Sequence, residues 1–176
     1  LQWDPPVCRV LRSANQSIAN NAATAISWDT ESKDTDTMHD PSVNPTRITI
    51  KTAGYYLVSA GVTYQSNATG ERLTDVLFNG SLFLAMDTRP GSGGNGPEVT
   101  LSFARQFAVN DYFEIRAYQN SGGALNVGEG ASGHEFGPRR DERHAPRERL
   151  LDHVFEGGAV GEGAVARVVH AGAVRA

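Results

Sequence analysis

The chain has 176 residues, of which 39% are hydrophobic and 20% charged, with a formal net charge of -4. No apolar run approaches the roughly 18 residues that a membrane-spanning helix needs, so we expect no membrane span. With only two lysines, Lys33 and Lys51, the chain lacks the basic clusters typical of nucleic-acid binding proteins. The single cysteine, Cys8, excludes an internal disulfide framework and a cysteine-rich zinc site.

The composition changes at about residue 137. Residues 1–136 are rich in Asn, Thr, Ser and Tyr and hold 9 Lys and Arg against 14 Asp and Glu. Residues 137–176 use only ten residue types, are rich in Gly, Ala and Arg, and hold 7 Arg against 6 acidic residues. Most of these ten types have GC-rich codons, so two explanations are open, a shifted reading frame and a natural low-complexity tail. We predict a short lead over 1–6, one domain over 7–136 and an atypical tail over 137–176.

The first half of this domain is predicted to consist of strands. Short strands are expected at 7–11, 24–28 and 47–51, where β-branched and apolar residues alternate with polar ones. The strongest strand is predicted at 55–65. Because strand side chains alternate between two faces, five apolar residues of this segment share one face. They are Tyr56, Val58, Ala60, Val62 and Tyr64.

The second half of the domain is also β-rich. Residues 73–78 and 82–86 flank Asn79-Gly80, a strong hairpin signal because both residues tolerate positive φ. A Pro/Gly-rich loop at 89–97 precedes predicted strands at 99–107 and 112–119. Strands that recur about every 8–12 residues indicate an all-β sandwich or barrel. In the tail, we predict one short helix between Pro146 and Gly157.

An ordered set of motifs along residues 7–136 resembles a known family. The motifs are Met38-His39-Asp40-Pro41, Arg47-Ile48-Thr49-Ile50, Ala53-Gly54-Tyr55-Tyr56-Leu57-Val58, the Asn79-Gly80 hairpin and the strand Asp111–Tyr118. They are similar to the C1q-like globular domain of the complement C1q/tumour-necrosis-factor superfamily, in which a proline stands at the place of Ala53 and a phenylalanine at that of Val58. Three further phrases look closest to microbial and tailed-phage members: Asn15–Ile18, Phe78–Gly80 and Tyr118–Val127.

The resemblance implies a jelly-roll β-sandwich of about ten antiparallel strands, usually assembled as a homotrimer, that binds rather than catalyses. We therefore expect a non-enzymatic trimerising structural or adhesion module, placed on a virion (tail or capsid-associated) or on a microbial surface, and hence extracellular. The alternative on the same fold is a carbohydrate- or receptor-binding module. The expected partners are further copies of the chain and a cell-surface receptor or glycan, with no nucleic acid.

The expected last strand departs from this family pattern. Glu135-Phe136 resembles its beginning, but Gly137-Pro138-Arg139-Arg140 then breaks the pattern, because proline lacks the N–H that a strand ladder needs. In this family the last strand is central in the inner sheet. Two outcomes are open: a tail segment such as 164–170 substitutes poorly for it, or the folded molecule is compromised.

Three carboxylates lie close together at Asp34, Asp36 and Asp40. Hard oxygen ligands at alternating positions suit calcium, so these residues are a candidate calcium site. The full Asp-x-Asp-x-Asn-Gly pattern is absent, and the alternative is a solvated loop whose Asp side chains cap turns. No other metal and no organic cofactor is expected.

No catalytic residue is expected. His39 beside Asp40 invites a catalytic interpretation, but triads need spatial rather than sequential adjacency, and no Gly-x-Ser-x-Gly elbow occurs. The resemblance instead makes Asp40-Pro41 a turn into a strand. Cys8 lies in a predicted strand, where a buried, inert thiol is expected.

Two surfaces are candidates for binding. The predicted loop 89–97, with Arg89, Ser92 and Asn95, could contact a receptor glycan, because loops on β scaffolds often carry function; a simple connector is the alternative. Tyr55, Leu57 and Tyr118 fall on strand faces opposite the expected core and are a candidate subunit interface. Local packing under loops is the alternative for these three side chains.

Overall fold

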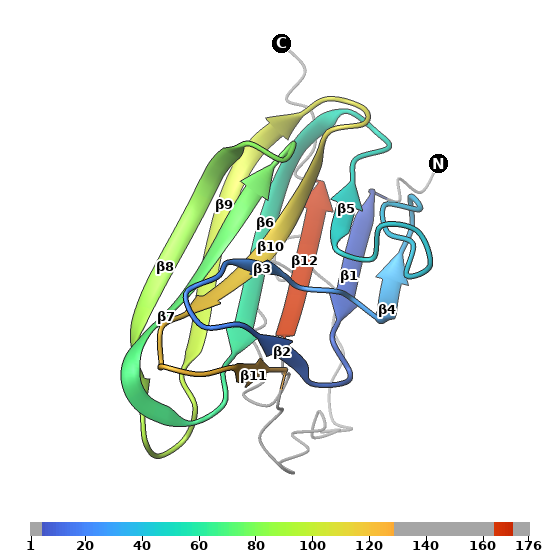
Figure 1. Cartoon of the computed structure of the whole chain (residues 1–176). Coiled ribbons are helices and arrows are strands. Elements are labelled where there is room, and N and C mark those ends of the chain that lie inside the picture. The colour runs from blue at the N-terminus through green and yellow to red at the C-terminus, as the bar shows by residue number, and fades with distance from the viewer. Residues whose placement is uncertain (1–4, 129–163, 171–176) are drawn as a thin grey trace, which may run out of the picture.

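The computed structural model describes residues 5–128 and 164–170, and this part of the chain contains strands and no helix (Figure 1). The strands are β1 (Val7–Leu11), β2 (Gln16–Ile18), β3 (Thr24–Ala25), β4 (Thr30–Asp34), β5 (Arg47–Thr49), β6 (Gly54–Thr63), β7 (Asn67–Phe78), β8 (Leu82–Ser92), β9 (Glu98–Phe107), β10 (Tyr112–Gln119), β11 (Leu125–Val127) and β12 (Ala164–His170).

The strands form a sandwich of two antiparallel sheets. The first sheet has the order β4-β1-β12-β6-β9, and the second has the order β3-β10-β7-β8, with β5 also paired to β10. Strands β2 and β11 form a separate two-stranded ribbon. Neighbours in the sheets are mostly distant in sequence, as in a jelly roll, and the predicted all-β class is confirmed.

The core lies between the two sheets and is built by alternating side chains. On β6 the predicted apolar face is buried, since none of its five residues is more than 5% exposed. On β10, Phe113 and Ile115 are fully buried and face it from the second sheet. The ring of Phe107 joins the two layers, with centroid distances of 6.0 Å to Tyr56 and 5.8 Å to Phe113. Full burial of one such side chain contributes roughly 1.5–3 kcal/mol.

The predicted Asn79-Gly80 hairpin joins β7 to β8. Both residues have positive φ, 47° and 72°. The Asn79 side chain also ties the turn to the start of β10, because its amide donates to Asp111 Oδ1 (2.9 Å) and its oxygen accepts from the Tyr112 N–H (2.9 Å). The turn therefore fixes the register of β7 and β8 and their position beside β10.

Strand β12 fills the central position of the first sheet, between β1 and β6. Its inward residues Ala164, Ala166 and Val168 are fully buried. The sequence predicts a domain over 7–136, whereas the first sheet includes this strand from the predicted tail. The expected strand start at Glu135-Phe136 and the expected helix between Pro146 and Gly157 lie outside the described residues.

One predicted loop is partly a strand. Strand β8 continues to Ser92, so the prediction of a loop over 89–92 is wrong, and only residues 93–97 connect β8 to β9. Pro90 is tolerated because β8 is the last strand of its sheet and pairs only with β7. Gly91 lies so close to β7 that a Cβ there would be 2.6 Å from the Asn67 carbonyl oxygen. Pro90 and Gly91 are therefore part of an edge strand and not of a loop.

Candidate functional site

The predicted subunit-interface residues lie on different sheets. Tyr55 and Leu57 are on β6, where they point away from the core and are 49% and 37% exposed. Tyr118 is on β10 of the second sheet, half-buried, and its hydroxyl donates to Asn21 Oδ1 at 3.1 Å. The structure therefore separates Tyr118 from the other two, because the whole sandwich lies between the outward faces of the two sheets.

The outward side of the first sheet carries apolar and small side chains on β6 and β9, and the charged Arg9 on β1. Leu57 lies opposite Ala104, and Ser59 opposite Ser102, so small side chains flank the two larger ones of β6. On β1, the outward positions alternate with the buried Cys8 and Val10. We call this surface the flat face, and its members are Val7, Leu11, Tyr55, Leu57, Ser59, Ser102, Ala104 and Gln106.

A second apolar surface follows the edge at which β8 and β9 end their sheets. Phe83 and Met86 are 55% and 62% exposed, and the Phe83 ring lies 4.9 Å from the Arg116 guanidinium. Other apolar side chains here are only partly covered, since no strand bridges β8 to β9. We call this surface the open edge, and its members are Leu82, Phe83, Leu84, Met86, Leu101 and Phe103.

Two of the three carboxylates of the candidate calcium site, those of Asp34 and Asp40, accept hydrogen bonds within the 35–46 loop, whereas Asp36 Oδ2 is buried without a hydrogen-bond partner. Asp34 accepts from the backbone N–H groups of Asp36 (3.1 Å) and His39 (2.9 Å). Asp40 Oδ1 accepts from the Ser42 N–H (2.8 Å) and hydroxyl (2.6 Å), and these bonds hold the Asp40 pKa below its usual value. Within the described residues, no group of three or more His, Cys, Asp or Glu side chains could hold a metal ion. The contacts match the turn-capping interpretation.

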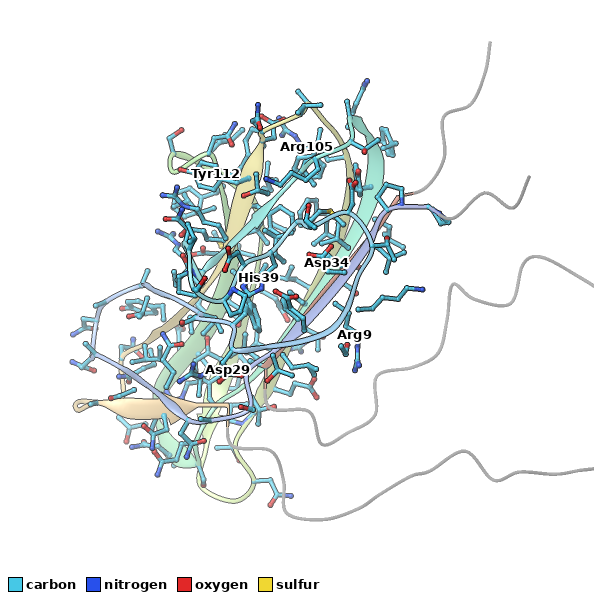
Figure 2. All side chains as sticks on the ribbon, turned by 90° about the vertical axis from the view of Figure 1, so that its right-hand side faces the viewer. Arg9, Asp29, Asp34, His39, Arg105 and Tyr112 are labelled. Carbon is cyan, nitrogen blue, oxygen red and sulfur yellow. The ribbon has the colours of Figure 1, made fainter. Side chains whose placement is uncertain are left out.

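His39 is buried in the same loop, and Figure 2 labels it beside Asp34. Its Nδ1 lies 2.7 Å from Glu31 Oε1 and its Nε2 lies 3.1 Å from the Pro45 carbonyl oxygen. Both ring nitrogens are thus occupied, one by β4 and one by the end of the loop. The ring makes no hydrogen bond to the Asp40 carboxylate in the described structure, so the sequence neighbours do not form a catalytic pair.

A hollow of about 490 Å³ opens beside this loop, between β4 and β5. Its walls include Glu31, Asn44, Arg47 and Lys51. The Arg47 guanidinium lies 4.2 Å over the Tyr112 ring, and its Nε is 3.6 Å from Glu114 Oε1. The hollow therefore combines charged groups of both signs with neutral donors and acceptors. No motif in the sequence pointed to Asn44 or Lys51.

The three residues proposed for the binding loop have different environments. Arg89 lies within β8 and forms an ion pair with Asp87 at 3.0 Å. Ser92 ends β8, and its carbonyl oxygen accepts from the Ser66 hydroxyl at 3.2 Å. Of the three, only Asn95 lies in the connection 93–97, where it is exposed. The side chain of Asn95 is thus the one that a ligand of this loop would meet.

Cys8 is fully buried on β1, as the sequence predicted. Burial is the main reason that the pKa of its thiol is raised far above the usual value, and the nearby Asp34 and Glu31 carboxylates add to the effect. The thiolate, which is the reactive form, is therefore strongly disfavoured in the folded protein.

The arrangement of strands was compared with known proteins. Murine APRIL at pH 8.0 superimposes with a TM-score of 0.59 at 11% identity, covering 95% of this chain and 99% of that one. Eiger TNF from S. frugiperda gives 0.58 at 9% identity, covering 98% and 97%. The globular domain of zebrafish complement 1qA gives 0.53 at 11% identity, covering 69% and 91%.

The fold is a C1q/TNF-like jelly roll. At these identities the likeness concerns the fold alone. No family model and no curated protein matches the sequence. Residues 5–128 and 164–170 include no helix of the length and hydrophobicity that crossing a bilayer requires.

Proposed function

We propose that the chain is a non-enzymatic, trimerising structural or adhesion module. The observation that carries this proposal is the pair of apolar surfaces on one copy, the flat face and the open edge. Large exposed apolar areas usually mark interaction sites. Leu57 represents the first surface and Phe83 the second, and the two belong to different sheets.

Two different apolar surfaces on one copy are compatible with a ring. When the open edge of one copy packs on the flat face of the next, each contact is heterologous, and rotation about one axis closes the assembly. The small side chains around Leu57 let the protruding Phe83 and Met86 approach the sheet closely. Three copies per ring is the number implied by the resemblance to C1q-like domains.

The non-enzymatic part of the proposal is supported by the state of the candidate catalytic side chains. His39 has both ring nitrogens engaged, and the thiol of Cys8 is buried with a raised pKa. A hydrolase built on His39 would lose its activity in the variant His39→Ala. We expect no hydrolytic activity in either protein, and activity that depends on His39 would contradict the proposal.

The trimer is tested by light scattering of the full chain at micromolar concentration. Leu57→Asp places a charge in the centre of the flat face, so we expect the variant to be a monomer, whereas the parent has three times the mass of one chain. Val109→Asp is the matched control, because Val109 is also an exposed apolar residue (51%, against 37% for Leu57) but lies in the turn between β9 and β10. A monomeric parent, or a trimeric Leu57→Asp, would contradict the proposal.

We place the module on a virion or a microbial surface, and thus outside the cell. This location is supported by the sequence segments that resemble microbial and tailed-phage members of the C1q-like family, such as Tyr118–Val127. Genes for tail or capsid proteins beside the coding gene would agree with it, and a neighbourhood of cytoplasmic metabolic genes would contradict it.

The second candidate is a carbohydrate- or receptor-binding module on the same fold, supported by the exposed Asn95 in the connection 93–97. A glycan array with the parent chain and with Asn95→Ala separates the two candidates. Reproducible binding that is lost in Asn95→Ala favours a ligand-binding loop. Binding that is unchanged by this substitution shows that the loop is only a connector.

A further inference from the structure

The shape of the hollow beside His39 is maintained by hydrogen bonds within the protein. The backbone N–H of Thr49 donates to the Met38 carbonyl oxygen at 2.7 Å, which folds the loop against β5. The N–H of Arg47 donates to the Asn44 carbonyl oxygen at 2.9 Å, and His39 holds Pro45 from inside. At about 490 Å³ the hollow falls within the range of roughly 300–1,000 Å³ that is typical of small-molecule sites.

Polar groups of the lining are left without partners. In the described part of the chain, neither the Asn44 amide nor the Thr49 hydroxyl makes a side-chain hydrogen bond, and each can both donate and accept. Asp40 uses only Oδ1 for its bonds to the 42–43 backbone and Ser42, which leaves Oδ2 as a further acceptor. The hollow therefore offers three side-chain groups for hydrogen bonds to a ligand, of which those of Asp40 and Asn44 are exposed to solvent.

The charges of the lining favour a neutral ligand. Glu31 Oε1 lies 2.7 Å from the His39 ring, and Arg47 pairs with Glu114. The remaining charges, those of Asp40 and Lys51, have opposite signs, so an ion of either sign would meet a like charge. A ligand with several hydroxyl groups can donate to the carboxylate and accept from the ammonium at the same time.

We propose that this hollow binds one neutral pyranose unit of a surface glycan. The sugar hydroxyl groups pair with Asn44, Thr49 and Asp40 Oδ2, and an apolar C–H face of the ring packs on Val43, which is 59% exposed at the rim. The inference rests on the proposed binding function for the source of the ligand, and not on the trimer. The proposed sugar site lies on the side of the sandwich that carries the 35–46 loop, apart from Asn95.

The test uses the full chain and methyl pyranosides of glucose, galactose, mannose and N-acetylglucosamine, followed by saturation-transfer NMR and titration calorimetry. We expect at least one of them to bind with a Kd on the order of 1 mM, as for a single weakly held small ligand. Asn44→Gly removes the amide and keeps the positive φ of 55° at this position, while Thr49→Val removes only the hydroxyl. Each variant should weaken binding about tenfold or more, since a sugar hydroxyl loses its partner.

Thr88→Val, which removes an exposed hydroxyl on β8 outside both candidate ligand sites, is the matched control and should leave the affinity unchanged. The proposal is overturned when no pyranoside binds at about 20 mM, or when Asn44→Gly and Thr49→Val both bind as well as the parent. Light scattering of the same samples reports the assembly separately. A monomeric chain that binds the sugar through Asn44 contradicts the proposed trimer and supports the sugar site. A trimer that binds no sugar supports the proposed trimer and contradicts the sugar site.

Discussion

His39 and Glu31 are joined by a hydrogen bond of 2.7 Å between Nδ1 and Oε1, with the imidazole fully buried and the carboxylate 31% exposed. The opposite nitrogen of the ring faces the Pro45 carbonyl oxygen, which can only accept. This pair fastens the 35–46 loop to β4.

The first prediction concerns His39→Ala. The substitution leaves a cavity and removes two hydrogen bonds, so we expect the free energy of unfolding to fall by about 2–3 kcal/mol. Urea unfolding followed by circular dichroism measures it. Lys33→Ala on the exposed side of β4 is the control and should change stability by no more than about 0.5 kcal/mol. Equal effects of the two variants would show that the pair does not hold the loop.

The second prediction concerns the ion pair of Arg116 and Asp75. The guanidinium donates twice, at 2.8 and 2.9 Å, to a carboxylate that is only 5% exposed. Arg116→Met leaves this carboxylate buried and unpaired, so we expect a loss of about 3–5 kcal/mol in chemical unfolding. Addition of Asp75→Leu to this variant should recover a large part of the loss.

Arg89→Met is the matched control for Arg116→Met. Arg89 pairs with Asp87 at a similar distance of 3.0 Å, but both side chains are well exposed (54% and 33%). Solvent screens such a pair, so the expected loss is about 0–1 kcal/mol. A loss in Arg116→Met that is no larger than in Arg89→Met would contradict the argument from burial.

The third prediction compares two glycines of the connection 93–97. A Cβ on Gly96 would overlap the Tyr64 carbonyl oxygen, whereas a Cβ on Gly94 would meet nothing within 4 Å. Gly96→Ala must therefore displace the start of β9 from β6, and we expect a loss of at least about 2 kcal/mol. Gly94→Ala should have the melting temperature of the parent within about 2 °C. A stable Gly96→Ala would mean that the connection takes another path.

The fourth prediction concerns alkaline pH. Burial raises the pKa of Tyr64 to about 12, while its hydroxyl donates to the Leu73 carbonyl oxygen. The phenol ionises near pH 10 in the unfolded chain, so the folded state keeps its advantage below pH 10 and loses it between pH 10 and about 12. We expect Tyr64 to account for a loss of about 2–3 kcal/mol across this window.

Urea titrations at several pH values test this assignment. Tyr64→Phe should flatten the alkaline decline but not abolish it, because burial also raises the pKa of Tyr56 to about 12. Tyr55→Phe, on the exposed neighbour of Tyr56, should leave the profile of the parent unchanged. A Tyr64→Phe profile with the full decline would show that Tyr64 does not contribute.

The sequence predicted those elements whose side chains alternate in polarity. The buried face of β6 and the Asn79-Gly80 turn follow from the two-residue period and from tolerance of positive φ. Strand β4, with the sequence Thr-Glu-Ser-Lys-Asp, has no apolar period, and it is a strand because β1 pairs with it. Local pattern could not reveal that tertiary contact.

The candidate sites were predicted less well for a related reason. Asp34 and Asp40 are predicted as candidate calcium ligands with turn capping as the alternative, and the hydrogen bonds that they accept depend on neighbours in sequence. The different position of Tyr118 depends on which sheet β10 joins, and the exposure of Phe83 depends on β8 being an edge. The run Leu82-Phe83-Leu84 was a local signal for an exposed apolar surface, but it also fits a buried strand.

The central position of β12 has a consequence for the order of folding during synthesis. Within the described chain, β1 pairs only with β4 and β12, so the β1–β4 pair joins the β6–β9 pair through residues 164–170 alone. The ribosome delivers β1 first and β12 last. The first sheet can therefore close only after residues 164–170 have been synthesised, and such long-range pairing makes folding slow. Until then, Cys8 and Val10 of β1 lack their neighbours in β12, Val168 and Ala166.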